Sequence, residues 1–223
     1  MMYFKRAYII FFTLILMLGV TGCMGANNIN SNQKENVREK VIRYMNDKYD
    51  CVFKYIDSVD GGLDQNNRYI LVSCDNLPDK EIKVTYCNDN GIETFADNYM
   101  HLRFEKQTCN LIEELLEEVF KQDFILDYKI KGTTNSFDNT TSFEEFLESS
   151  ASEIVFYAVI NRDFDKAEEA ELRETLNNVF KEHIPYCRGY LYFEKNSKTF
   201  ETFDEFPTLE LQDMVELKFE TQK

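Results

Sequence analysis

Apolar side chains recur at the three- and four-residue spacing of an α-helix in several stretches of the chain. In the first, Val37, Val41 and Met45 lie four residues apart, and charged residues fill most of the other positions. In the last, the periodic residues stop shortly before Pro185, which cannot continue a helix. The predicted helices cover residues 35–48, residues 94–121, a short segment from Ser142, and a segment from Asp163 or Asp165 to about Glu182.

Two of these helices carry further local signals. Ser142 is followed three residues later by Glu145, which is the spacing of a capping box and favours a helix start at Ser142. Within 94–121 the helical period is clearest from Gln107 onward. Residues 98–104 also alternate between apolar and polar positions as a strand would, so either structure is open for that segment.

Runs with the two-residue alternation of a strand separate these helices. Asn90 and Gly91 mark a tight turn after one of the runs. Residues 154–160 are nearly all apolar, as expected of a central strand covered on both faces. The predicted strands are residues 51–56, 68–74, 81–87, 124–130, 154–160, 189–195, 199–203 and 214–219, with a loop over 58–67 and a turn at 196–197.

Helices and strands interleave irregularly, and most neighbouring strands can be joined by short hairpins. This arrangement predicts an α+β fold with mainly antiparallel sheet and packed helices, following an N-terminal signal helix that is cleaved. Residues 35–223 form either one such domain or two halves, 35–121 and 124–223.

The first residues have the layout of a secretory signal peptide. Lys5 and Arg6 precede an unbroken apolar run that ends at Val20, and small residues lead from there to Cys23. The run is about 14 residues long, which is shorter than the roughly 18–20 needed to cross the hydrocarbon core of a membrane.

The ending Val20-Thr21-Gly22-Cys23 resembles the lipobox of bacterial lipoproteins. The resemblance implies cleavage between Gly22 and Cys23, so that residues 1–22 are a lipoprotein signal peptide. It also implies that Cys23 becomes the lipidated first residue, with residues 23–34 as a polar, flexible tether. The expected location is the outer face of the cell membrane, held by the lipid, because two acyl chains anchor a protein stably.

The region around residues 44–49, Tyr-Met-Asn-Asp-Lys-Tyr, loosely resembles small lipoproteins of clostridia. This second resemblance brings no known activity and no residue role.

Net charge narrows the range of partners. The chain has 25 Lys and Arg against 40 Asp and Glu, and the leader holds two of the basic residues and no acids, which leaves about −17 after cleavage. Nucleic acid is excluded as a partner because phosphate binding needs a cationic surface. Docking of the domain itself on anionic lipid is disfavoured for the same reason. A basic protein partner is compatible with this charge.

Metal and disulfide chemistry receive little support. Asp57, Asp60 and Asp64 lie in a Gly-containing segment and are the calcium candidates, although their spacing departs from the EF-hand pattern. Five cysteines remain after Cys23, and either Cys51–Cys74 or Cys74–Cys87 could pair across a sheet, whereas free buried thiols are the favoured interpretation. No cofactor is predicted, and no zinc-ligand spacing occurs.

No catalytic residue can be nominated. The two histidines are His101 and His183, and His183 and Cys187 are four residues apart with Pro185 between them. The function favoured is a membrane-tethered, non-catalytic binding or interaction module of unknown ligand, of which an immunity- or inhibitor-type protein is the sharper form. The alternative is a cell-envelope hydrolase that uses carboxylates or the Cys187/His183 neighbourhood.

Overall fold

Four antiparallel strands form the first sheet, in the order β1-β2-β3-β4. The computed structural model describes residues 36–60, 67–121, 124–130, 132–194 and 214–221. The turn between β3 and β4 uses Asn90 and Gly91, both with positive φ, as the twist of a tight hairpin requires. The strands are β1 (Phe53–Asp60), β2 (Asn67–Cys74), β3 (Leu77–Asp89) and β4 (Ile92–Asp97).

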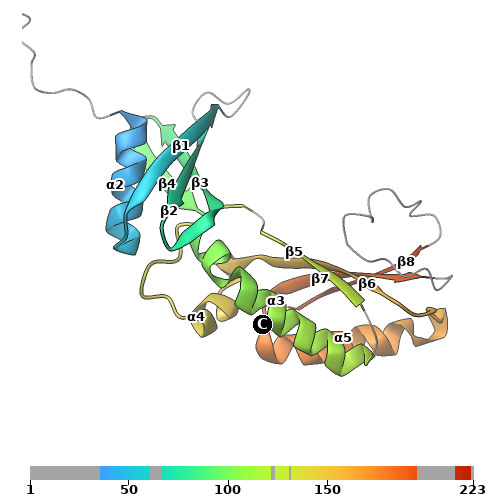
Figure 1. The fold of residues 1–223 in the computed structure, drawn as a ribbon. Helices are drawn as coiled ribbons and strands as arrows, with labels where there is room; N and C mark the ends of the chain where they lie inside the picture. Colours follow the sequence, from blue (N-terminus) through green and yellow to red (C-terminus); the bar gives the residue numbers. More distant parts are fainter. Residues whose placement is uncertain (1–35, 61–66, 122–123, 131, 195–213, 222–223) are drawn as a thin grey trace, which may run out of the picture. The chain divides into compact units, whose positions relative to one another are not determined.

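Helix α2 (Val37–Tyr49) covers one face of this sheet (Figure 1). Val41 and Met45, two of the residues whose spacing predicted the helix, are fully buried. On β3, Ile82, Val84 and Tyr86 alternate with more exposed residues and are buried, so one face of the sheet forms part of the core.

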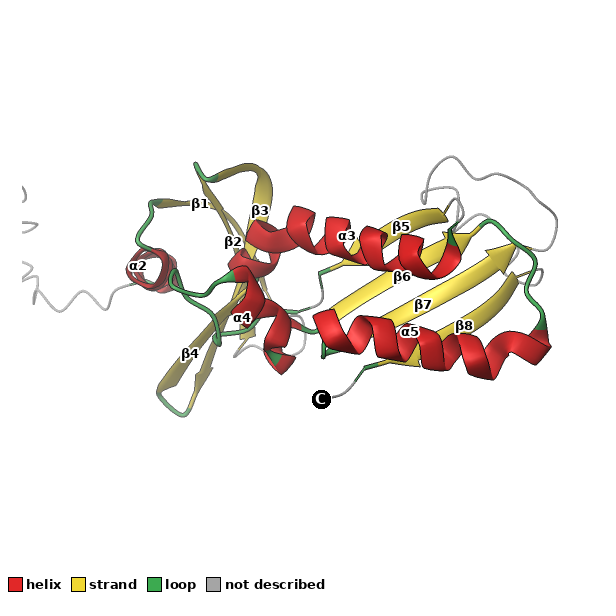
Figure 2. Ribbon diagram, turned by 90° about the horizontal axis from the view of Figure 1, so that it is seen from below, coloured by secondary structure: helices red, strands yellow, loops and turns green. Residues whose placement is uncertain are grey.

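The second sheet has the order β5-β6-β7-β8 and contains one parallel pair, β6 with β7. Figure 2 shows α3 and α5 side by side on one face of this sheet. β6 is buried along nearly its whole length, as predicted for a central strand. The strands are β5 (Phe124–Lys129), β6 (Ile154–Ile160), β7 (Cys187–Glu194) and β8 (Met214–Glu220), and the helices are α3 (Tyr99–Phe120), α4 (Phe143–Glu148) and α5 (Glu169–His183).

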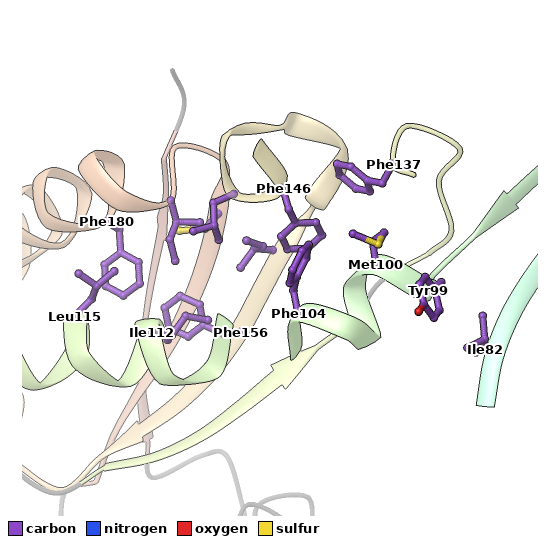
Figure 3. Close-up of a cluster of buried hydrophobic side chains, with 14 of the residues drawn as sticks. Ile82, Tyr99, Met100, Phe104, Ile112, Leu115, Phe137, Phe146, Phe156 and Phe180 are labelled. Carbon is purple, nitrogen blue, oxygen red and sulfur yellow. The ribbon is translucent and has the colours of Figure 1, made fainter. Parts of the chain in front are cut away.

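Aromatic side chains fill the core beneath these helices. Phe104 of α3 packs on Phe146 of α4, and Phe137 packs on the other side of Phe146, with ring centroids 5.3 and 5.1 Å apart (Figure 3). Gly189 of β7 lies where a Cβ atom would overlap the ring of Phe219. The glycine therefore permits β7 to approach an aromatic cluster that a side chain would push apart.

A buried carboxylate joins α2 to the end of β4. Asp97 is 2 % exposed, and one of its oxygens accepts hydrogen bonds from the Lys48 ammonium at 2.8 Å and the Tyr44 hydroxyl at 3.1 Å. The other oxygen accepts from the Tyr49 hydroxyl at 2.7 Å and from the backbone N–H of Tyr99 at 3.0 Å. Each oxygen of the carboxylate therefore accepts two hydrogen bonds.

The same residue also joins β4 to the segment that follows β5. The backbone N–H and C=O of Asp97 pair with those of Thr134, both at 2.9 Å. Burial, followed by the charge of Asp97, raises the pKa of Tyr44 and of Tyr49, so both phenols stay protonated and able to donate.

The α+β class with mainly antiparallel sheet is confirmed, and two boundaries of the prediction are corrected. Residues 94–97 belong to β4 and not to a helix, because they pair with β3 in an antiparallel ladder. The helix begins only at Tyr99. β1 continues through Asp60, into the segment predicted as a loop. The β6–β7 pair is parallel because α5 returns the chain to the same end of the sheet.

Several predictions concern residues that the structure does not describe. The leader with its signal helix, Cys23 and the tether, and the predicted turn at 196–197 with its partner strand at 199–203, all lie outside the described residues. Within the described part of the chain, no helix is both long and apolar enough to cross a membrane.

Replacing Asp97 tests whether this carboxylate holds the first sheet to α2. We expect Asp97→Ala to lower the free energy of unfolding by about 3 kcal/mol, because it leaves the half-buried Lys48 ammonium without its carboxylate and the Tyr49 hydroxyl and Tyr99 N–H without their acceptor. Urea denaturation followed by circular dichroism measures the change. Asp79→Ala, at an exposed position of β3, is the matched control and should change stability by less than about 0.5 kcal/mol. A loss at Asp97 as small as that of the control would contradict the structural role.

Candidate functional site

His101 is part of the core. Its side chain is buried on α3, and its Nε2 lies 2.8 Å from the backbone carbonyl of Ser152. Because a carbonyl only accepts, Nε2 carries the proton, and Nδ1 is buried with no hydrogen-bond partner among the described residues. Burial lowers the pKa of the imidazole, so the ring is neutral and serves packing against Phe137 and Phe146.

The two members of the Cys187/His183 neighbourhood differ in exposure. Cys187 is buried at the start of β7, where its backbone N–H donates to the Thr221 hydroxyl. Burial raises the pKa of its thiol to about 12, so the thiol is protonated at neutral pH and is a poor nucleophile. His183 is exposed at the end of α5, and no hydrogen bond among the described residues joins it to Cys187.

The other cysteines of the described residues, Cys51, Cys74, Cys87 and Cys109, are free thiols as well, so neither Cys51–Cys74 nor Cys74–Cys87 forms a disulfide. Cys51 and Cys74 are close enough to influence each other: burial first, and then Cys74, raises the pKa of Cys51. Cys109 on α3 is half-buried, and desolvation raises its pKa to about 11. Neither Cys51 nor Cys109 is therefore set up as a thiolate.

The calcium candidates lie along β1 and beyond it. Asp57 is exposed on β1 and accepts a hydrogen bond from the backbone N–H of Ser58, while Asp60 is opposite Arg68 of β2 in the strand register. Asp64 lies outside the described residues. In the part of the chain that is described, no three His, Cys, Asp or Glu side chains gather in a way that could hold a metal ion.

A pocket of about 800 Å³ opens where α3, α4 and α5 meet. Such a volume is in the range of pockets that hold small molecules. The sequence places the walls through two local signals. The capping box of Ser142 and Glu145 starts α4, and Pro185 follows the end of α5. The lining residues are Leu111 of α3, Glu144, Leu147 and Glu148 of α4, Asn178, Lys181, Glu182 and His183 of α5, and Pro185.

The pocket combines apolar and charged surface. Leu147 and Pro185 are buried and Leu111 is half-buried, so they provide apolar surface in the pocket. Three exposed carboxylates also line it, those of Glu144, Glu148 and Glu182, against a single ammonium group, that of Lys181. The balance of charge therefore favours a ligand with a cationic head and an apolar stem, as a lysine or arginine side chain has.

Sequence reasoning singled out His183 but missed the carboxylates that share its pocket. Glu144 and Glu182 are 38 positions apart in the sequence and come from different helices. The i, i+4 spacing of Glu144 and Glu148 on the exposed side of a short amphipathic helix was available as a signal. Spacing alone does not show which other helix that side faces.

No family model matches the chain, and no curated protein does. A solved structure described as the crystal structure of a DUF5037 family protein from Ruminococcus gnavus ATCC 29149 is similar in part. Its TM-score is 0.37 at 16% sequence identity, and the match covers 71% of this chain and 74% of that chain. A likeness at this level supports no inference about what the chain binds or does.

The burial of His101 predicts a pH dependence of stability. Its folded pKa is lowered, so below about pH 6.5 the unfolded chain takes up a proton that the folded chain does not. Unfolding free energy should therefore fall as the pH drops from about 6.5 toward the folded pKa, by at most about 1.4 kcal/mol per pH unit from this residue. Urea denaturation across this range should show a shallower decline for His101→Leu than for the unsubstituted protein. Equal slopes would contradict a neutral, buried His101.

Proposed function

We propose that this protein is a lipid-anchored, extracytoplasmic binding module that receives a basic side chain of a protein partner in the α3–α4–α5 pocket. The observation that carries the proposal is the charge of that pocket: three glutamates and one lysine line it together with apolar residues. A partner presenting lysine or arginine would place its methylene stem against Leu147 and Pro185 and its charge among the carboxylates. An immunity- or inhibitor-type role, in which the acidic module masks a basic partner, is one form of this function.

The acidity of the whole chain supports the same class of partner. A net charge of −15 over the full sequence attracts a cationic protein over a longer range than the pocket alone and speeds its approach. The long-range part of this attraction weakens as salt is added, since the Debye length falls to about 10 Å at 0.1 M. Contact between the partner and the apolar residues of the pocket is not screened by salt. Binding should therefore weaken as salt is added without being lost entirely.

A non-catalytic role fits the state of the reactive groups. His101 is neutral and buried, and the Cys187 and Cys109 thiols are held protonated by burial. His183 is the imidazole that lines the pocket, where no thiol accompanies it. We therefore assign the pocket to recognition and not to nucleophilic catalysis.

A pull-down from cell envelopes tests the pocket. Full chain carrying a C-terminal tag is the bait, at low and at high salt. We expect a basic partner whose capture by the triple variant Glu144→Gln, Glu148→Gln, Glu182→Gln is about tenfold weaker, since three exposed ion pairs of up to about 1 kcal/mol each are lost.

The matched control removes the same charge elsewhere. Glu113→Gln, Glu114→Gln, Glu117→Gln changes three exposed carboxylates of α3 and leaves the pocket intact. Equal losses in the two triple variants would show that net charge, and not the pocket, recognises the partner. Chemical turnover of the captured partner would instead support the hydrolase alternative.

The anchor is tested separately at Cys23. The lipobox-like ending at Cys23 supports lipidation there, and a diacylglycerol would add two acyl chains, each contributing about 0.8 kcal/mol per buried methylene. We expect Cys23→Ala to abolish labelling of the protein by a radioactive fatty acid in growing cells. Cys87→Ala, which removes a cysteine of the folded region, should leave labelling unchanged. Labelling that survives Cys23→Ala would refute lipidation at this residue.

A further inference from the structure

Exposed apolar side chains concentrate along the outer strand of the first sheet. Within the described part of the chain, β1 pairs with β2 on one edge and with no strand on the other. Val52, Ile56 and Val59, in β1 and directly before it, are 65%, 41% and 51% exposed. The other large apolar side chain with comparable exposure among the described residues is Ile92, at 70%, on β4 at the opposite edge of the sheet. An exposed apolar edge strand is a template for pairing with another strand.

A β-bulge in β1 decides which of its side chains share a face. Phe53 and Tyr55 pair with Cys74 and Val72 of β2, and the register then shifts so that Asp57 is opposite Leu71. Ile56 is the extra residue. Because the shift reverses the alternation, Lys54, Asp57 and Val59 all lie on the face away from α2, although Lys54 and Asp57 are three residues apart.

This pattern is complementary to itself under a two-fold rotation. If a second copy of β1 is placed antiparallel with Val52 opposite Val59 of the other copy, Lys54 falls opposite Asp57 and Phe53 opposite Ser58. Lys54 and Asp57 lie on one face and Phe53 and Ser58 on the other, so the members of each of these two pairs share a face, as partners across an antiparallel ladder must. Without the bulge the same register would put Lys54 and Asp57 on opposite faces.

We propose that two copies of this protein associate through β1, edge to edge and antiparallel, so that their first sheets become one continuous sheet. The charges along β1 favour a second copy of the chain as the partner of this strand. Each Lys54 meets an Asp57 of the other copy, and this pair occurs twice in a symmetric dimer. The existing ion pair of Lys54 with Asp75 does not oppose this, since those side chains are 61% and 81% exposed and their interaction is weak.

The dimer and the pocket are separate surfaces. None of the residues that line the pocket belongs to β1 (Phe53–Asp60). Loss of one therefore does not imply loss of the other, and the pull-down above does not decide this proposal.

Sedimentation equilibrium of the full chain in a density-matched detergent tests the dimer. We expect a monomer–dimer equilibrium for the unsubstituted protein. Lys54→Asp and Asp57→Lys should each raise the dimer Kd about tenfold or more, because like charges then face each other twice. The double variant carrying both substitutions should return to within about threefold of the original Kd.

Mixing the two single variants separates a contact between copies from damage within one copy. A Lys54→Asp chain and an Asp57→Lys chain present opposite charges to each other, so the mixture should dimerise more tightly than either variant does alone. A control pair compares Val59→Lys, which should abolish the dimer, with Ile92→Lys, which places the same charge at an exposed apolar position on the far edge and should leave it unchanged. Circular dichroism confirms that each variant is folded.

A monomeric unsubstituted protein at all concentrations would overturn the proposal, as would failure of the double variant and of the mixture to restore association. Equal effects of Val59→Lys and Ile92→Lys would also overturn it, because they would show that the association does not use β1.

Discussion

The carboxylate of Asp97 brings together segments that are far apart in the sequence. Asp97 is the last residue of β4 and lies just before α3. Its carboxylate accepts hydrogen bonds from α2, and its backbone pairs with that of Thr134. A charge buried to this extent is tolerated only where donors surround it, so the positions of Lys48, Tyr44 and Tyr49 are fixed relative to the strand. The start of α3 is fixed by the same contact, because the Tyr99 N–H donates to that carboxylate.

From that start, α3 runs along the core to the second sheet. Its buried residues include Phe104, which packs on Phe146 of α4, and Ile112 and Leu116 further along. This packing places α4 and α5 beside α3, and the pocket forms where the three helices leave their exposed sides toward one another. The apolar lining of the pocket is therefore a result of core packing. The charge of the pocket comes from exposed residues that take no part in that packing.

Local patterns in the sequence were enough for most of the elements. Val41 and Met45 are buried as their spacing implies, the Ser142–Glu145 capping box forms, and Asn90-Gly91 makes the predicted hairpin turn. The misassigned segment, 94–97, shows why boundaries were harder. Its residues are compatible with both periods over so short a stretch, and the pairing of β4 with β3 decides the outcome. The same holds for β1, whose extension through Asp60 depends on its pairing with β2.

The sequence by itself determined the α+β class, the approximate places of the helices and strands, the strongly acidic charge, and the lipobox-like ending at Cys23 from which the anchor is proposed. These properties depend on composition and on periodicity within a few residues. Only the tertiary structure decided that β6 and β7 run parallel, that Cys187 is buried while His183 is exposed, that Glu144 and Glu182 share a pocket, and that a bulge puts Lys54 and Asp57 on one face. Each of these depends on which distant segments come into contact, and periodicity within a segment carries no record of that choice.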